Sequence, residues 1–394
     1  MSRLYEEISG DGGTRNRQRW LLAAAAVWLL ALFGWLFLRC PVALTEVPFC
    51  AIVEKKAAPL NLGVVPPAAE GLAASEPSAA YRGFFWDLEA PASAAGLPVN
   101  FRTADGAFRN PPLVDPAFPQ DAVPSRKGLE TLRASGSAEF SEQGLAALVQ
   151  ELRRHTDGPI YIVDLRQESH GFLDGNAVGW CGLRDWGNLG RSDDAVIADE
   201  EARLQGTLGR AVPVVMLGTE RYISDVDFVL VGQDRKLRET GVLQVTEAKT
   251  EQALVEAAGL RYARFFATDV IWPRAEVVDA FVAFVRDLPA GAWLHFHCRV
   301  GSGRTTSFLV MYDMMRNPDV ACDDILLRQY LLGGMAYGAL RTPSRGADWK
   351  AYYGNERSVM VRKFYEYVQE NHATRYAVPW SVWLADHIAD VSYR

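Results

Sequence analysis

The stretch His297-Cys298-Arg299-Val300-Gly301-Ser302-Gly303-Arg304-Thr305-Thr306-Ser307 decides how the rest of the chain is interpreted. It follows the apolar run Trp293 to His297, which predicts a buried strand, and it opens the helical pattern Thr305 to Met315. A loop between a strand and a helix directs its backbone N–H groups and the helix dipole at one point, which makes a binding site for an anion. We expect Gly301 and Gly303 to supply the positive φ angles that such a curl needs.

Two residues of this stretch are suited to phosphate transfer. The converging N–H groups and the helix dipole lower a thiol pKa, so we expect Cys298 to be a thiolate nucleophile. Arg304 offers a bidentate fork to two phosphate oxygens. We expect Thr305 to donate a hydrogen bond to the sulfur and His297 to fix the loop, whose remaining members are Arg299, Val300, Gly301, Ser302 and Gly303. A buried structural cysteine is the plainer alternative, but it does not explain two glycines and an arginine in the same frame.

A phosphocysteine mechanism also needs a general acid that protonates the leaving oxygen. Asp269 is the candidate, within Thr268-Asp269-Val270-Ile271-Trp272-Pro273. The Trp-Pro pair would stiffen a loop lying over the phosphate site. Read alone, Asp269 is more simply an aspartate in a turn before a helix; beside the Cys298 loop, the acid interpretation is favoured.

Composition sets the outer limits of the interpretation. The chain has 394 residues, 49% of them hydrophobic and 23% charged, which is typical of a globular protein with a sizeable core. The net charge of −7 argues against broad nucleic-acid binding. Five cysteines are too few for a disulfide scaffold, and the sequence leaves the pairing of Cys40, Cys50, Cys181 and Cys322 open.

The N-terminus predicts a membrane segment. Residues 20–38, WLLAAAAVWLLALFGWLFL, carry no charge and as a helix would span roughly the ~30 Å hydrocarbon core. The arginines in residues 1–19 place that tail in the cytoplasm and the rest of the chain outside, which predicts a periplasmic location with one inner-membrane anchor. A cleaved signal peptide, with a secreted product, is the alternative. Residues 39–95 are expected to be an Ala/Pro-rich linker.

Beyond the linker the pattern is that of an α/β domain, expected over residues 96–394. Ile160 to Asp164 and Val212 to Leu217 have the pattern of buried strands, and the segment from Phe140 to Leu152 has helical spacing with Ser141 as N-cap. Strands that alternate with helices predict a mainly parallel sheet covered on both faces. A strand-rich part around 205–245 predicts a small β insertion.

At this point the chain resembles the protein-tyrosine-phosphatase-like inositol polyphosphatases, also called cysteine phytases. The resemblance runs from about Asn100 to Asp386. It rests on HCxxGxGRT and on further segments, which are Asn100 to Thr103, Ser135 to Ser141, Asp164 to Leu173, Arg184 to Gly190 and Trp380 to Leu384. The family implies a phosphatase α/β domain with an inserted partial β-barrel. It also implies that no metal and no organic cofactor take part.

The resemblance assigns roles to matching positions. It implies Cys298 as nucleophile, Arg304 as phosphate clamp and Asp269 as general acid. Family members surround the pocket with basic side chains that hold the other phosphates of an inositol ring, and the counterparts by position are Arg102, Arg235, Lys236, Lys350 and Arg357. We expect Asp199 to face the pocket as well. Asp164, Arg166 and His170 either line the site or form structural hydrogen bonds at a strand end.

Two departures from the family bear on the substrate. Val270 stands where the family usually has His after the general acid, so a contact to substrate phosphate is expected to be lost. Arg299 stands where the family commonly has a smaller or acidic residue, and we expect it to add a cation that favours polyanions. A few converging cations outweigh distant surface acids, whose fields are screened beyond about 8–10 Å, so the net acidity is no obstacle.

These observations predict a phosphatase that removes phosphates from phytate and lower inositol polyphosphates through a phosphocysteine. The alternatives are a phosphatase for phosphotyrosine or phosphoinositides and a weakly active inositol-phosphate binding module. A rhodanese-like sulfurtransferase also uses a cysteine in an anion loop, but the Gly-x-Gly-Arg-Thr ending and the Asp269 loop disfavour it. The sequence leaves the oligomeric state open.

Overall fold

A computed structural model of the chain describes residues 83–111, 118, 121–182, 185–217, 237–337 and 349–387. The predicted anchor, residues 20–38, lies outside these ranges and stays a prediction. None of the helices within the described ranges combines the length and the apolar character that crossing a membrane requires.

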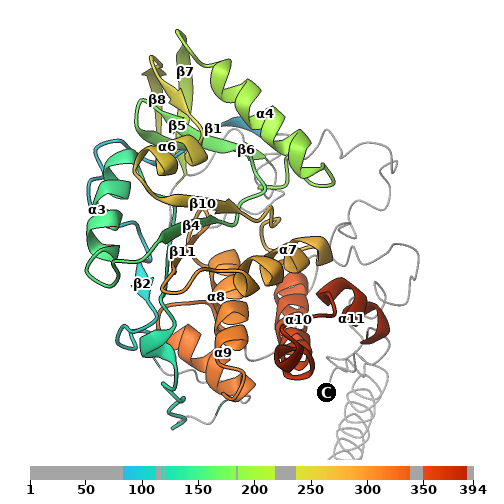
Figure 1. Cartoon of the computed structure of the whole chain (residues 1–394). Helices are drawn as coiled ribbons and strands as arrows, with labels where there is room; N and C mark the ends of the chain where they lie inside the picture. The colour runs from blue at the N-terminus through green and yellow to red at the C-terminus, as the bar shows by residue number, and fades with distance from the viewer. Residues whose placement is uncertain are drawn as a thin grey trace, which may run out of the picture. The chain divides into compact units, whose positions relative to one another are not determined.

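A five-stranded sheet carries the middle of the fold (Figure 1). The four parallel strands all end on the same side of the sheet. The fifth strand, β2, lies at a lateral edge and pairs antiparallel with β3. Ligands of open α/β sheets bind outside the carboxyl ends of the parallel strands. In spatial order the strands are β10 (Arg261–Arg264), β4 (Ile160–Asp164), β11 (Trp293–His297), β3 (Ala134–Ser137) and β2 (Arg102–Thr103).

All five residues of the strand β11 are buried, the two histidines His295 and His297 included. Trp293 belongs to a core cluster with α3 (Glu142–Leu152) and α6 (Glu251–Ala257). Phe296 points the other way and stacks edge-on against Phe281 of α7 (Ala275–Arg286), which in turn contacts Phe308 of α8 (Gly303–Arg316). Alternate residues of one strand therefore serve two helical layers.

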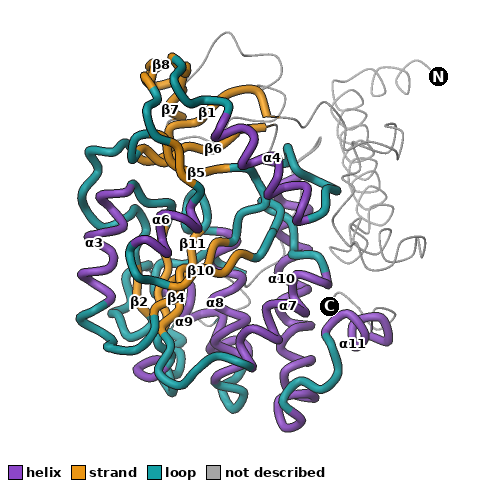
Figure 2. Tube along the Cα trace, turned by 45° about the horizontal axis from the view of Figure 1, so that its top comes forward, coloured by secondary structure: helices purple, strands orange, loops and turns teal. Residues whose placement is uncertain are grey.

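A six-stranded sheet lies at one end of the domain, beyond the first sheet, in both Figure 1 and Figure 2. The strand β1 sits inside it, parallel to β7 and antiparallel to β6. The helix α4 (Asp193–Gln205) packs against β5. In spatial order the strands are β8 (Leu237–Gln244), β7 (Ala211–Leu217), β1 (Gly83–Ala90), β6 (Asn176–Gly182), β5 (His170–Leu173) and β9 (Ala248–Lys249).

Further helices cover the outer face of α7 and α8. The helix α10 packs against α8, and α11 packs against α7. Aromatic side chains fill the space between them, with Trp380 of α11 in edge contact with Tyr367 of α10. The bounds are η3 (Leu129–Thr131), α9 (Cys322–Leu331), α10 (Trp349–Asn371), η5 (His372–Thr374) and α11 (Trp380–His387).

The predicted α/β fold with a parallel-rich sheet is confirmed. Ser141 caps α3 as expected, since its Oγ accepts from the Gly144 N–H at 2.9 Å. Two boundaries differ. Residues 83–90, expected to be linker, form a strand, because their apolar residues pair in the middle of a sheet. The β part is also larger than residues 205–245, because β1, β5, β6 and β9 join β7 and β8.

Candidate active site

The catalytic loop, residues 298–303, leaves the carboxyl end of β11 and enters α8. Three of its carbonyl groups are bound by donors from outside the loop, which turns the intervening N–H groups toward its centre. The pairs are the Glu139 N–H to Arg299 at 3.2 Å, the Asn100 side chain to Val300 at 2.8 Å and the Arg102 side chain to Gly301 at 2.8 Å.

The two loop glycines serve different purposes. Gly301 has φ +73°, as expected, and a Cβ there would lie 2.3 Å from the Ala138 nitrogen. Gly303 was expected to have positive φ too, and this is wrong, because it forms the first residue of α8. Its lack of a side chain makes room for Arg357, whose NH1 would lie 2.5 Å from a Cβ at position 303.

Cys298 is only 2% exposed at the start of this loop. Thr305 donates a hydrogen bond to its Sγ at 3.2 Å, as the sequence predicted. Burial raises the pKa of the thiol, but the Arg304 charge and the Thr305 bond outweigh burial and hold the pKa below its ordinary value. Cys298 is therefore disposed to be a thiolate nucleophile.

The buried guanidinium of Arg304 is held by Glu168. Its NH1 and NH2 lie 2.6 and 2.8 Å from the two oxygens of that carboxylate, and NH1 also donates to the Ala267 carbonyl. On the remaining side, Nε of Arg304 lies 3.1 Å from Oδ1 of Asp269. Burial opposes the charge of Glu168, but Arg304 and Arg166 keep its pKa well below the ordinary range.

The loop that carries Asp269 is fixed at several points. The indole of Trp186 donates to the Asp269 carbonyl at 2.8 Å, and Thr268 donates to the Gln167 side chain at 2.6 Å. Asp269 itself keeps 31% of its side chain exposed, so solvent and ligands reach it. Val270 has φ +67°, a strained conformation for a β-branched residue.

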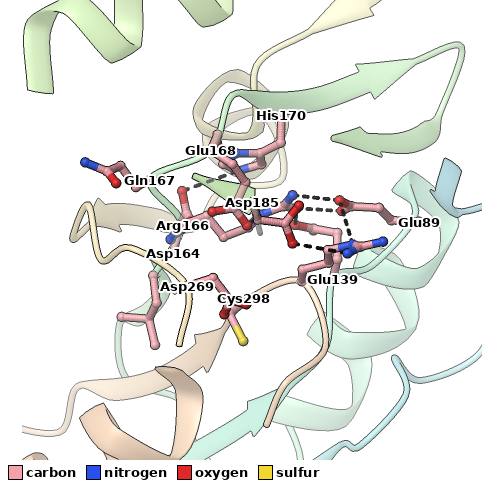
Figure 3. Close-up of polar contacts among 12 residues, drawn as sticks. Glu89, Glu139, Asp164, Arg166, Gln167, Glu168, His170, Asp185, Asp269 and Cys298 are labelled. Carbon is pink, nitrogen blue, oxygen red and sulfur yellow. Dashed lines mark hydrogen bonds and ion pairs between the residues drawn. The ribbon is translucent and has the colours of Figure 1, made fainter. Parts of the chain in front are cut away.

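A buried ion network lies behind the loop (Figure 3). Arg166 is its centre and pairs bidentately with Glu89, at 2.6 and 2.7 Å, and with Glu139 at 2.7 Å. Its Nε donates to Glu168, the partner of Arg304. Arg166 therefore supports the phosphate clamp from behind, and the hypothesis that it forms structural bonds is the one the contacts favour.

His297 and His170 extend this network. Nε2 of His297 lies 2.8 Å from Glu251, and together with Glu139 this carboxylate raises the His297 pKa to about 9 against the effect of burial. Nδ1 of His170 donates to the Glu168 carbonyl, and its Nε2 faces Glu251 at 3.0 Å. Burial and Arg166 lower the pKa of His170, but Asp164 and Glu200 raise it well above the ordinary value, which favours the protonated ring.

Two groups of acidic and histidine side chains are compact enough to hold a metal ion. Both are fully buried, and in each the histidine makes the ion pairs described above. Two arginines add further positive charge, since Arg166 pairs with Glu139 at 2.7 Å and Arg264 pairs with Asp164 at 3.0 Å. These arrangements account for the carboxylates without an ion. The groups are Glu139, Glu251 and His297, and Asp164, His170 and Glu251.

Arg102 and Arg357, expected to contact substrate, lie on two sides of the catalytic loop. Arg102 is 4% exposed and also donates to the Asn100 carbonyl; burial lowers its pKa to about 10, and the Cys298 charge opposes that shift. Arg357 is 3% exposed, and among the described residues its NH1 has one hydrogen-bond partner, the Met335 sulfur at 3.9 Å. Burial raises the pKa of the adjacent Glu356 to about 8, so that carboxyl is neutral at pH 7.

The other expected substrate contacts are less well placed or lie outside the described side chains. Asp199 accepts from Ser169 at 2.8 Å and pairs with Arg203 and Arg191, so its carboxylate is already occupied. Lys350 belongs to α10, but its side chain is not described, and Arg235 and Lys236 fall in an undescribed range. Their contacts with substrate stay predictions.

Arg299 does not supply the free cation that its sequence position suggested. Its NH2 makes a close ion pair with Asp87, NH1 lies 3.1 Å from Asp185, and Nε lies 3.5 Å from Glu89. These carboxylates neutralise it, so its expected contribution to polyanion binding is wrong. Cys181 lies beside this group, and burial and Asp185 raise its thiol pKa, so Cys181 packs rather than reacts.

Sequence reasoning missed most of the carboxylates around the loop. Glu168 lies inside a family segment, two residues after Arg166. The need of Arg304 for a carboxylate partner was the signal that could have pointed to it. Asp87 and Glu89 gave no signal, because they lie in the segment assigned to the linker. The missed residues are Asp87, Glu89, Glu139, Glu168, Asp185, Glu200, Glu251 and Arg264.

Comparisons with known proteins agree with this geometry. The family model for PTP-like phytase, described as "Inositol hexakisphosphate", matches residues 163–316. The PTP-like myo-inositol phosphatase from Mitsuokella multacida, solved with myo-inositol-(1,3,4,5)-tetrakisphosphate, is 45% identical with a TM-score of 0.70; the match covers 79% of this chain and 50% of that one. A PTP-like phytase from Bdellovibrio bacteriovorus is 27% identical with a TM-score of 0.57, over 78% and 97%.

The matched segment and these structures support the PTP-like inositol polyphosphatase family for this chain. Effector protein hopD2 of Pseudomonas syringae pv. tomato is 26% identical over 260 residues, which is 66% of this chain and 52% of that protein. The chain thus spans about half the length of the hopD2 and Mitsuokella proteins. Membership in a family of phosphatases fits a loop in which a cysteine, an arginine and an aspartate meet around an anion site.

Proposed function

We propose that this protein removes phosphates from phytate and lower inositol polyphosphates through a phosphocysteine intermediate, without a metal ion. The observation that carries the proposal is that two buried arginines flank the catalytic loop without a carboxylate partner among the described residues, Arg102 through Gly301 and Arg357 at Gly303. Each also has a buried Nε without a hydrogen-bond partner there. Buried charges require a counter-charge, and a substrate with several phosphates supplies it.

In the first step the Cys298 thiolate attacks the phosphorus of a monoester, and the bond to the inositol oxygen breaks. The loop N–H groups and Arg304 hold the equatorial oxygens of the phosphoryl group as charge develops. Arg304 is preset for this task by its two bonds to Glu168. Asp269, 3.1 Å from Nε of Arg304, protonates the departing oxygen.

In the second step a water molecule attacks the phosphocysteine. Asp269 is now the base that accepts the water proton, the S–P bond breaks and inorganic phosphate leaves. The thiolate is a good leaving group because Thr305 and Arg304 stabilise it. The cycle ends with Cys298 ionised and Asp269 protonated, ready for the next ester.

A comparison of two substrates tests the choice of a polyphosphate. Arg357→Met should lower kcat/KM for phytate about tenfold or more, since a charge-assisted contact contributes roughly 1.5–3 kcal/mol, and should leave p-nitrophenyl phosphate nearly unaffected. Arg362→Met is the matched control on the same helix, because Arg362 pairs with Asp323 at the surface. Equal losses on both substrates would count against the proposal.

We propose, from the sequence alone, that the enzyme works outside the cytoplasm on an anchor formed by residues 20–38. The support is the length of this apolar segment and the arginines that precede it. Fractionation of cells that produce the full chain tests it. Recovery in the soluble cytoplasmic fraction would contradict it.

A further inference from the structure

Two carboxylates of the strand β1, Asp87 and Glu89, are connected to the beginning and to the end of the catalytic loop. Asp87 and Glu89 both reach Arg299, although the pairing of β1 with β6 shifts register between Leu88 and Ala90. Asp87 is 1% exposed, and the Glu89 side chain is 3% exposed. At Asp87 the strand pairs with both β6 and β7, so this carboxylate extends from the middle of the sheet.

The first contact is at the beginning of the loop. Asp87 pairs with Arg299, the residue directly after the nucleophile, and Glu89 lies 3.5 Å from Nε of the same guanidinium. The backbone carbonyl of Arg299 is fixed as well, by the Glu139 N–H. Side chain and main chain of residue 299 are thus both held, which constrains the peptide group between Arg299 and Val300, next to the nucleophile.

The second contact reaches the end of the loop through intermediates. Glu89 pairs bidentately with Arg166, Arg166 donates to Glu168, and Glu168 holds Arg304. Each of these side chains is almost fully buried, so the chain of ion pairs is little screened by solvent. Figure 3 shows Glu89, Arg166 and Glu168 with Cys298.

We propose that Asp87 and Glu89 are positioning residues for catalysis, and that β1 is a working part of the active site. The inference rests on the proposed function for its chemistry. Both carboxylates lie outside residues 163–316, the segment that the family model matches. They act through Arg299 and Arg304 and hold the loop N–H groups and the phosphate clamp in a reactive geometry, where a displacement of about 1 Å costs on the order of a hundredfold in rate.

A double-mutant cycle on the full chain tests the Asp87 contact. Asp87→Asn and Arg299→Gln keep side-chain size and remove one charge each. Each should lower kcat for p-nitrophenyl phosphate at least tenfold and change KM less than about threefold, because the loop is displaced rather than lost. The kcat of the double variant should be no lower than the kcat of the less active single variant. Asp87→Glu, which keeps the charge, should recover most of kcat.

A control separates positioning from stability. Asp313 of α8 forms a fully buried pair with Arg328 of α9, with Nε and Oδ2 2.9 Å apart. Asp313→Asn should lower the melting temperature at least as much as Asp87→Asn and leave kcat per folded molecule unchanged. If Asp87→Asn does not fold, Arg299→Lys replaces it in the test; Lys keeps the charge but not the fork that spans Asp87 and Asp185, and a tenfold loss of kcat is expected.

The outcomes are decisive in both directions. Wild-type kcat in folded Asp87→Asn or Arg299→Lys would overturn the proposal, as would effects that multiply in the double variant. Because p-nitrophenyl phosphate reports only the cysteine chemistry, the result does not depend on phytate. A protein that hydrolyses this ester and ignores phytate would refute the proposed substrate, while the β1 contacts would still be tested.

Discussion

Both carboxylate oxygens of Glu168 accept hydrogen bonds from Arg304, at 2.6 Å from NH1 and 2.8 Å from NH2. The guanidinium of Arg304 is therefore held in position by the protein itself, and its Nε lies 3.1 Å from Oδ1 of Asp269. The same carboxylate is bound from the other side by Arg166. A single buried glutamate thus joins the catalytic loop to the ion network behind it.

Removing this charge should damage catalysis. Glu168→Gln keeps the size of the side chain but removes the carboxylate that holds NH1 and NH2 of Arg304, so kcat/KM for phytate should fall roughly 10- to 100-fold. Glu168→Asp keeps the charge and shortens the reach, and should lose less. Steady-state kinetics with both variants check the prediction. Wild-type kcat/KM in folded Glu168→Gln would contradict it.

Loss of the general acid should depend on the leaving group. Asp269→Asn removes the proton donor, so phytate hydrolysis should slow by roughly 10²–10⁴-fold. p-Nitrophenolate departs without a proton, so the same variant should hydrolyse p-nitrophenyl phosphate with a much smaller loss. The comparison of kcat for the two esters checks this. Equal losses would exclude Asp269 as the acid.

Val270 stands where the family usually has His, and its backbone conformation is unfavourable for valine. Its φ of +67° is unfavourable for a β-branched residue, whereas His and Asn tolerate this region better. Val270→His should raise the free energy of unfolding by about 1 kcal/mol and lower KM for phytate. Val270→Asn is the control, since it should gain stability without the imidazole contact. An unchanged KM in Val270→His would refute the predicted phosphate contact.

The buried histidine of the loop predicts a pH dependence of stability. The folded protein holds the His297 pKa near 9, above the ordinary 6.5, so the folded state binds the proton more tightly than the unfolded chain. This stabilisation is complete below pH 6.5 and is lost as pH rises through 9, at up to about 1.4 kcal/mol per pH unit. Urea unfolding at pH 6.5, 7.5 and 9 measures it. His297→Gln should flatten the profile; a flat profile in the wild type would contradict the prediction.

The arrangement of the Cys298 loop was predictable from sequence because it occupies one continuous stretch. Cys298, Arg304 and Thr305 follow a strand and open a helix, and local spacing is enough to bring them together. Asp269 needed the family pattern, since an aspartate before Trp-Pro has simpler explanations. The limits of β4 (Ile160–Asp164) and β11 (Trp293–His297) agree with the strands expected from the sequence, since the pattern is strong where both faces of a strand are buried.

The carboxylates that support the loop were not predictable in the same way. Asp87 and Arg299 are 212 positions apart, and only the pairing of β1 with β6 and β7 brings them together. The sequence predicts Arg299 to be a free cation, because carboxylates that neutralise it come from a segment that resembles a linker. Arg102 posed the same difficulty, since its contact with Gly301 depends on the folded loop.

The central claim is that Cys298 attacks the phosphates of an inositol polyphosphate. The measurement that tests it most directly is phosphate release by the purified full chain from phytate, a phosphotyrosine peptide and a soluble phosphoinositide, each repeated with Cys298→Ser. The account predicts a clear preference for phytate and no turnover by Cys298→Ser. Preference for either of the other substrates, or substantial phosphate release by Cys298→Ser, would contradict it.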